Sequence, residues 1–186
     1  MSFITKEKSV ALYAALVSFG TYVFIFGFRK SFTVCTFEGM TFGPIAFKTA
    51  MVISQMLGYL MAKFYGIKFI SGLEKKNRYK IIFLLTGIAW AAWLLFAIVP
   101  APYSILFLFI NGFPLGMLWG VVFSYVEGRK STDFIGAALA VSFIFSAGWV
   151  KSVGGWLMLQ FHISEFWVPF CTGLVFALPL VICVYG

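Results

Sequence analysis

The chain alternates between six long apolar runs and short connections that carry most of its charged residues. The runs cover about residues 10–36, 46–69, 81–99, 105–126, 137–160 and 168–186. An α-helix needs about 20 apolar residues to cross about 30 Å of hydrocarbon, and each run is about that long or longer. Transmembrane β-strands would alternate apolar and polar side chains, whereas Ile81–Leu85 and Gly173–Leu178 are apolar on every face. The pattern therefore predicts an all-α integral membrane protein with six transmembrane helices.

The composition excludes a soluble globular domain. Apolar residues make up 62% of the 186 residues and charged residues 11%, whereas soluble domains contain about 45–50% apolar and about 25% charged residues. Six spans with short connections use the whole length, which leaves no room for a soluble domain. We therefore expect residues 1–186 to form a single six-helix transmembrane domain that is surrounded by the lipid bilayer.

The net charge of +8 is mainly a signal of topology. Nine of the fourteen Lys and Arg lie at the start of the chain and in the second and fourth connections: Lys6, Lys8, Lys68, Lys75, Lys76, Arg78, Lys80, Arg129 and Lys130. Basic connections stay on the cytoplasmic side of a membrane. Both termini are therefore expected in the cytoplasm of a multi-pass protein of the inner (plasma) membrane. Because topology accounts for these charges, no nucleic acid partner is expected.

Polar side chains inside the spans are segregated by helix. The first span carries Arg29 and Lys30, and the second carries Lys63. The fourth carries Asn111 and the fifth Lys151, whereas the third and sixth contain no ionisable acid or base. Two triplets with the same order of polar and apolar helices are typical of structural repeats, with helices one, two, four and five around a cavity and helices three and six facing lipid. Because the charges well inside the spans are all basic, such a cavity would attract an anion.

Arg29 allows two interpretations. If the first helix continues to residue 36, it carries a polar stripe on one face, made of Ser18, Tyr22, Arg29, Thr33 and Thr36. If the helix stops at Phe28, Arg29 and Lys30 would instead extend to the headgroups at the membrane surface.

Lys63 and Lys151 present the same choice. Lys63 shares a helical face with Gln55 and Tyr59, but it lies near the cytoplasmic end, where its ammonium group could reach the headgroups. Lys151 lies about 21 Å into the fifth span, where a charge is costly. Small residues one turn away on either side leave space for a substrate or for a neighbouring helix.

The fourth span carries a small-residue motif. Gly112, Gly116 and Gly120 recur every fourth residue, so they lie on one face of the helix. Without side chains there, a neighbouring backbone can approach closely. We interpret the three glycines as a helix-packing face.

The sequence shows no catalytic apparatus. It contains no G-x-S-x-G nucleophile motif, no H-E-x-x-H metal motif and no pair of carboxylates within a span. Its single histidine, His162, lies in a connection, and Cys35, Cys171 and Cys183 form no C-x-x-C pair. We therefore expect no enzyme activity, no metal site, no disulfide framework and no cofactor.

The segment Thr21–Val34, which contains an Arg-Lys-Ser-Phe element, resembles the first helix of the organophosphate-exchanging branch of the major facilitator superfamily. Gly58–Gly66 is similar to the second helix of that branch, and Asn111–Gly120 to the fourth. With Arg29–Phe32, Gly58-Tyr59, Gly66–Lys68 and Val126–Asp133, the chain also resembles an uncharacterised Bacteroidetes-type group of facilitator-like proteins. The resemblance covers the chain as the amino-terminal half of a twelve-helix fold, and it implies that Arg29 faces a substrate phosphate. Ala62 stands where the superfamily's loop signature has an acid.

These features predict transport of a small organic anion, such as a phosphate ester, by alternating access. The expected substrate-binding residues are Arg29, Lys151, Gln55, Asn111 and Tyr22. The expected partner is a second six-helix half, which could be a missing C-terminal half, the product of a split gene or a second copy. The alternative is a non-transporting six-helix scaffold or assembly subunit, in which the intramembrane bases pair with acids of another chain.

Overall fold

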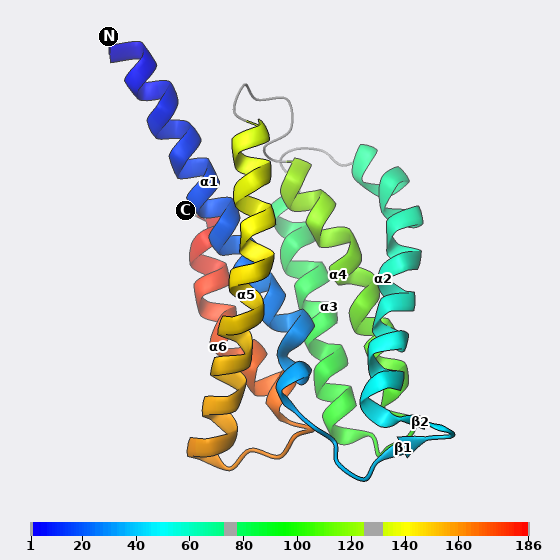
Figure 1. Ribbon diagram of the computed structural model, residues 1–186. Helices are drawn as coiled ribbons and strands as arrows, with labels where there is room; N and C mark the ends of the chain where they lie inside the picture. Colours follow the sequence, from blue (N-terminus) through cyan, green and yellow to red (C-terminus); the bar gives the residue numbers. More distant parts are fainter. Residues whose placement is uncertain (1, 73–77, 125–131, 186) are drawn as a thin grey trace.

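Six α-helices make up the computed structural model of the protein, which describes residues 2–72, 78–124 and 132–185 (Figure 1). The helices are α1 (Ser2–Lys30), α2 (Phe47–Ser71), α3 (Arg78–Ile98), α4 (Ile105–Ser124), α5 (Thr132–Phe161) and α6 (Val168–Tyr185). A short 3-10 helix, η1 (Ser31–Val34), follows α1, and the strands β1 (Thr41–Phe42) and β2 (Ile45–Ala46) form a small antiparallel hairpin before α2. The predicted all-α class is confirmed.

In the part of the chain that the structure describes, five helical segments are long and apolar enough to cross a membrane, as expected of a multi-pass membrane protein. They are Leu12–Val34, Arg78–Ile98, Ile105–Ser124, Gly136–Phe161 and Val168–Tyr185. The remaining helix, α2, is 25 residues long but less apolar, since Gln55, Lys63 and Lys68 lie along it.

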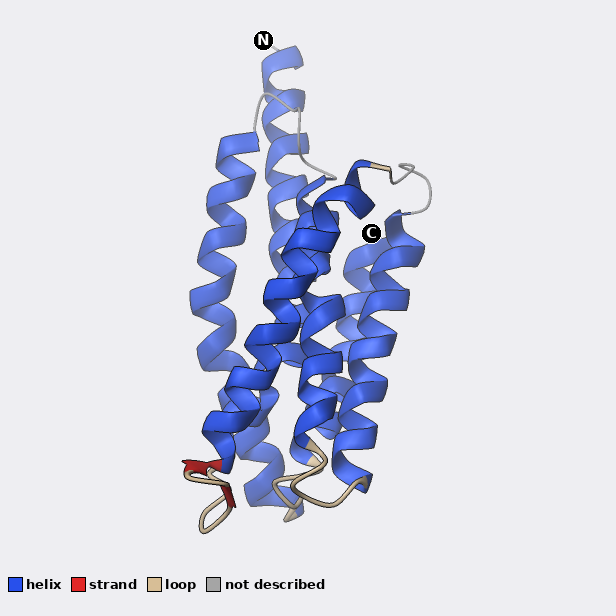
Figure 2. Cartoon of the chain, turned by 90° about the vertical axis from the view of Figure 1, so that its right-hand side faces the viewer, coloured by secondary structure: helices blue, strands red, loops and turns tan. Residues whose placement is uncertain are grey.

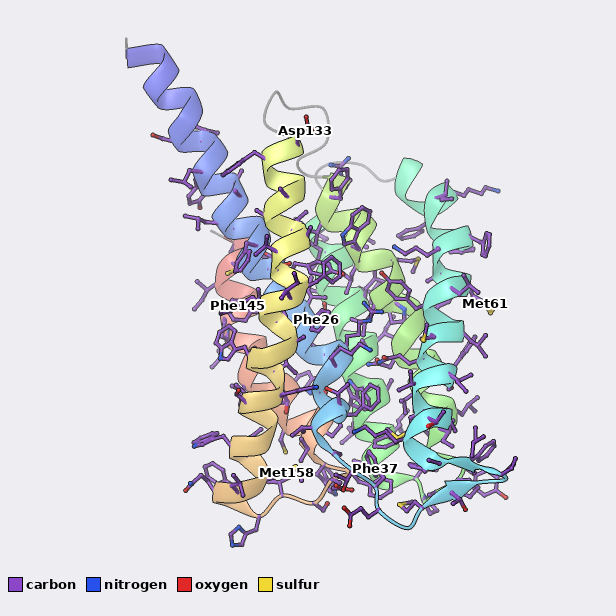
Figure 3. The ribbon with its side chains drawn as sticks, viewed as in Figure 1. Phe26, Phe37, Met61, Asp133, Phe145 and Met158 are labelled. Carbon is purple, nitrogen blue, oxygen red and sulfur yellow. The ribbon has the colours of Figure 1, made fainter. Side chains whose placement is uncertain are left out.

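The helices run between two distinct ends of the molecule (Figures 1 and 2). One end contains the beginning of α1, the end of α6 and Asp133 at the beginning of α5 (Figure 3). The opposite end contains the β1–β2 hairpin and the connections from α3 to α4 and from α5 to α6, and we call it the hairpin end. An even number of helices thus brings both chain termini toward the same end.

Helices α1 and α4 occupy the centre of the bundle. Helix α1 packs against α5 and α6, and α4 packs against α2 and α3, while α1 also contacts α4 and α3 contacts α6. The two central helices are also the most buried. In the most apolar window of each helix, 50% of α1 and 56% of α4 are buried, against 22% of α5. Met61 illustrates the outer surface, since it points away from the bundle on α2 (Figure 3).

Glycines allow the backbones of α2 and α4 to touch. A Cβ atom on Gly112 would lie 2.2 Å from the carbonyl oxygen of Gln55, and one on Gly58 would lie 2.2 Å from that of Phe109. A Cβ atom on Gly116 would lie 2.6 Å from the Cβ of Ala62. Gly112 and Gly116 of the predicted packing face therefore lie directly against α2. Gly120, one turn further along, is half-buried.

Neither alternative for the end of the first helix is right: α1 ends at Lys30, so the polar stripe does not continue as α-helix to Thr36, and the helix does not stop at Phe28. The chain then tightens into η1, in which the Thr33 hydroxyl donates to the Lys30 carbonyl at 2.6 Å, and it becomes extended at Cys35. Thr33 and Val34 are β-branched residues, which lose side-chain freedom in a helix. Thr36 lies beyond the helical turn and binds the α5–α6 connection instead.

Candidate anion-binding site

The end of α1 is held by side chains from three other helices. Because α1 stops at Lys30, the carbonyl groups of Phe28 and Arg29 are among the last four of the helix and lack an intrahelical partner. The Gln55 amide donates to the Arg29 carbonyl at 2.8 Å. The Asn111 amide (3.2 Å) and the Trp93 indole donate to the Phe28 carbonyl. These bonds satisfy backbone groups that lipid could not.

Asn111 is the centre of this network. Its side chain has no exposed surface, and its amide nitrogen also donates to the Ala89 carbonyl at 2.9 Å. Its side-chain oxygen accepts a hydrogen bond from Gln55 at 2.8 Å. Both polar side-chain atoms of Asn111 and the amide nitrogen of Gln55 are therefore engaged in holding the backbone that carries Arg29. Their predicted contact with a substrate stays a prediction.

Arg29 projects from this end of α1 toward aromatic rings. Its guanidinium carbon lies 4.1 Å from the ring centre of Tyr59 and 5.9 Å from that of Phe26, which lies between the two ends of the bundle (Figure 3). Cation–π contacts contribute about 0.5–1 kcal/mol at exposed sites and about 2 kcal/mol when desolvated. The Nε atom of Arg29 is buried and has no hydrogen-bond partner. An arginine has five N–H donors, so this side chain retains unused capacity to bind an acceptor.

Lys63 extends the site along α2 and α4. Its ammonium nitrogen lies 4.9 Å from the ring centre of Tyr59 and 5.0 Å from that of Trp119. The Trp119 ring stacks on Phe123, with centres 5.1 Å apart and planes 8° apart. Tyr59 therefore contacts two cations. Sequence reasoning did not assign Trp119 to the site, and its position eight residues after Asn111 places it about 80° further around α4.

Lys30 links Arg29 to α5. Its charge lies close enough to those of Arg29 and Lys151 to interact with both. The Lys151 side chain is exposed, and a Cβ atom on Gly148, almost one turn earlier in α5, would meet no heavy atom within 4 Å. Sequence reasoning identified Lys151, but it did not assign Lys30 to the site. We call Arg29, Lys30, Lys63 and Lys151 the cation cluster.

Tyr22 is a buried residue of α1 next to the cation cluster. Its side chain is 2% exposed, and its ring centre lies 4.8 Å from that of Phe143. It is close enough to Tyr59 and Arg29 to interact electrostatically with both. Of the five predicted substrate-binding residues, Arg29, Gln55 and Asn111 thus lie at the end of α1. Tyr22 lies about two turns earlier on the same helix, and Lys151 approaches through Lys30.

The acidic residues lie away from the cation cluster in sequence. All six are near the chain start, at the beginning of α5 or in connections: Glu7, Glu38, Glu74, Glu127, Asp133 and Glu165. Within residues 2–72, 78–124 and 132–185, no three His, Cys, Asp or Glu side chains gather as a metal site would require. The chemistry of the site is therefore that of positive charges and aromatic rings.

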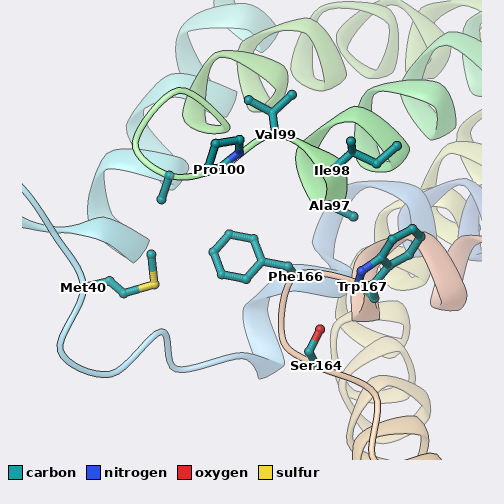
Figure 4. Close-up of a pocket in the computed structure, with 9 residues that line it drawn as sticks. Met40, Ala97, Ile98, Val99, Pro100, Ser164, Phe166 and Trp167 are labelled. Atoms are coloured by element: carbon teal, nitrogen blue, oxygen red, sulfur yellow. The ribbon is translucent and has the colours of Figure 1, made fainter.

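A separate pocket lies at the hairpin end (Figure 4). It has a volume of about 420 Å³, and its lining carries no charged side chain: Met40, Ala97, Ile98, Val99, Pro100, Ala101, Ser164, Phe166 and Trp167. None of these residues belongs to the cation cluster. The pocket therefore does not mark the anion site.

Cys35 lies beyond the first spanning segment and is fully buried. Its thiol donates to the Glu165 carbonyl at 3.4 Å. Burial raises the pKa of Cys35 to about 12, with a further contribution from the Glu165 charge and an opposing one from Lys48. All three cysteines are free thiols, and the other two, Cys171 and Cys183, are half-buried.

We expect Cys35 to react with a methanethiosulfonate reagent about ten times faster for each pH unit between pH 7 and pH 9. A thiol whose pKa is raised stays protonated through this range, so the reactive thiolate fraction grows tenfold per unit. The measurement uses the protein with Cys171→Ser and Cys183→Ser, so that Cys35 is the only thiol. A rate that levels off near pH 9 would show an ordinary thiol pKa and contradict the burial seen here.

The bundle and its surface define an all-α protein whose apolar helices are suited to several membrane crossings. Residues 31–186 match a family described as a family of unknown function, DUF5690, and the chain belongs to this family. The match begins directly after Lys30, so it covers Lys63 and Lys151 but not Arg29. Neither the curated proteins nor the solved structures contain a match to the chain.

Proposed function

We propose that the chain is one half of a secondary transporter that moves a small organic anion, such as a phosphate ester, by alternating access. The observation that carries this proposal is the buried, unpartnered Nε of Arg29 within the cation cluster. Arginine and lysine bind carboxylates and phosphates through charge-assisted hydrogen bonds. Arg29 and Lys30 are partly buried, and a partly desolvated cation favours an anion more strongly than the same charge would in water.

The packing of the helices supports two repeats of three. The two central helices each pack against two others, α1 against α5 and α6, and α4 against α2 and α3. Exchanging each helix with the one three places later turns the first set of contacts into the second, whereas the smaller α5–α6 and α1–α3 contacts have no equally extensive counterpart among the described residues. Repeats of this kind are common in secondary transporters, whose binding sites lie between the repeats near the membrane midplane.

The partner in this proposal is a second six-helix unit that faces the cation cluster. Helices α2 and α5 carry the site residues Lys63 and Lys151 on exposed surfaces. Rocking of the two units against each other would open the site to either side in turn. Following the distribution of basic residues, we place both termini in the cytoplasm of the inner membrane.

Cysteine accessibility tests the proposal against a scaffold role. Ala147→Cys and Ser152→Cys flank Lys151 on α5, and both positions are exposed on the isolated chain. In a background with the three native cysteines replaced by serine, we expect both to react with a membrane-impermeant thiol reagent. We also expect an anion substrate to slow the reaction, because a transport cavity contains water and the substrate would occupy it.

Leu178→Cys on α6 provides the matched control. Leu178 is 75% exposed and lies ten residues from the hairpin end of its helix, a depth between those of Ala147 and Ser152 on α5. It should stay unlabelled in the same background, because lipid rather than water surrounds it. Equal protection of all three positions, with and without anions, would favour a scaffold whose lysine pairs with another chain.

A further inference from the structure

A second cluster of charged residues surrounds the turn that follows α1. The Glu165 carboxylate, in the α5–α6 connection, accepts three hydrogen bonds from this turn. Its Oε1 accepts from the backbone N–H of Thr36 at 2.7 Å and from the Thr36 hydroxyl at 2.9 Å. Its Oε2 accepts from the backbone N–H of Phe37 at 2.7 Å. Hydrogen bonds to an ionised acceptor are shorter and stronger than neutral ones.

Lys48 of α2 holds the same turn through its carbonyl groups. The Lys48 ammonium donates to the Thr33 carbonyl at 3.0 Å and to the Cys35 carbonyl at 2.6 Å. The turn therefore receives donors from α2 on one side and an acceptor from the α5–α6 connection on the other. We call Glu165 and Lys48, together with residues 33–37, the clamp.

The clamp maintains an unfavourable backbone conformation. Phe37 has a φ of +52°, a left-handed value that is rare for a bulky residue. Such a residue persists only where its surroundings hold it in place. The Phe37 ring is 3% exposed and packs against Phe47 and Phe166, with ring centres 5.6 and 5.4 Å apart. Glu165 supplies the polar part of this support through the Phe37 N–H.

Only a few buried residues separate the clamp from the cation cluster. Ser31 and Phe32 have no exposed surface, and the Phe32 ring lies 5.7 Å from that of Trp93. On the α5 side, a Cβ atom on Gly154 would lie 2.9 Å from Val34, so η1 already touches α5 one turn after Lys151. A closely packed segment of this kind passes a displacement at one end to the other.

We propose that Glu165 is a positioning residue of the anion site, which holds the turn after α1 and thereby fixes Arg29 and Lys30 relative to Lys151. The roles of Arg29 and Lys30 in this inference rest on the proposed function. Glu165 itself binds no anion, since its charge is negative and its oxygens are occupied by the turn.

Glu165→Gln is expected to release the turn. A glutamine side chain has only one acceptor oxygen. Its N–H₂ group would face an N–H or O–H group of the turn that donates to the second carboxylate oxygen in the parent protein. With Cys35 as the only thiol, we expect its reaction with a methanethiosulfonate reagent at pH 7.5 to accelerate at least tenfold, because the turn is released and because the Glu165 charge no longer raises the thiol pKa. Glu38→Gln is the matched control, because it removes the same charge from an exposed position one residue after Phe37, and it should react like the parent protein.

A cross-linking experiment measures whether releasing the turn also moves Lys30 relative to Lys151 in the anion site. With all native cysteines replaced by serine, Lys30→Cys and Lys151→Cys should be joined efficiently by a short bifunctional methanethiosulfonate reagent. Adding Glu165→Gln should lower the cross-linked fraction at least threefold, whereas adding Glu38→Gln should leave it unchanged. A faster Cys35 reaction with an unchanged cross-link would overturn the positioning role, and an unchanged Cys35 reaction would overturn the clamp itself.

Thr36→Val covers the case in which Glu165→Gln fails to fold. It removes one hydrogen bond to the carboxylate and keeps the charge, so both readouts should move in the same directions by smaller amounts. Parent-like values in both readouts would count against the proposal. Neither readout uses an anion, so failure here leaves the transport proposal intact, and failure of anion uptake leaves the clamp intact.

Discussion

Replacing Arg29 with glutamine is expected to reduce anion uptake at least a hundredfold. Glutamine has similar polarity but no charge, so the variant loses the donor whose Nε is buried and unpartnered in the cation cluster. A hundredfold loss corresponds to about 2.7 kcal/mol, which is within the range for removing one member of a charge-assisted pair. The measurement is the initial rate of uptake into proteoliposomes that contain the complete assembly. The panel of substrates is inorganic phosphate, a phosphate monoester and a dicarboxylate.

Two further variants separate charge from geometry. Arg29→Lys keeps the positive charge but loses the planar fork of donors, so it should retain a measurable fraction of the uptake. Lys80→Gln removes the same charge from an exposed position at the beginning of α3 and should transport like the parent protein. If Arg29→Gln transports normally at normal expression, Arg29 is not a substrate ligand and the proposal fails at its central residue.

The positions of the helices could be predicted because burial in lipid demands apolar residues over a fixed length. The end of α1 shows where that argument stops. Hydropathy and helical spacing extend the first helix to Thr36, but Thr36 is bound by Glu165, which lies 129 residues away in the chain. A contact over such a separation depends on how α5 and α6 pack, and no local pattern in the sequence encodes it.

The candidate site could be predicted in part for the same reason. A charge within a span is rare enough to identify Arg29 and Lys151 directly. An aromatic residue is common in membrane helices, so nothing in the local sequence separates Trp119 from residues that face lipid. Its contact with Lys63 becomes visible only when α2 and α4 are packed together.

Gln55 and Asn111 show that a polar residue within a span has two possible uses. Sequence reasoning assigned both to the substrate, because helices two and four were expected to line a central cavity. In the structure the partner is the protein itself, because the end of α1 leaves carbonyl groups that these amides satisfy. Both amides thus hold the end of α1, which the local sequence does not encode, and their contact with a substrate stays a prediction.

Replacing Gly112 with alanine is expected to destabilise the protein by about 3 kcal/mol or more and to lower its folded yield. The new Cβ atom would lie 2.2 Å from the Gln55 carbonyl oxygen, a backbone atom that no side-chain rotation can move away. Helix α2 would have to shift by more than an ångström, which would also strain the Gln55 bonds to Arg29 and Asn111. Gly87→Ala on α3 is the control, since its Cβ atom meets nothing within 4 Å. Thermal unfolding of both variants in detergent provides the measurement. Equal unfolding midpoints for the Gly112→Ala and Gly87→Ala variants would show that α2 and α4 do not pack as closely as the Gly112–Gln55 distance indicates.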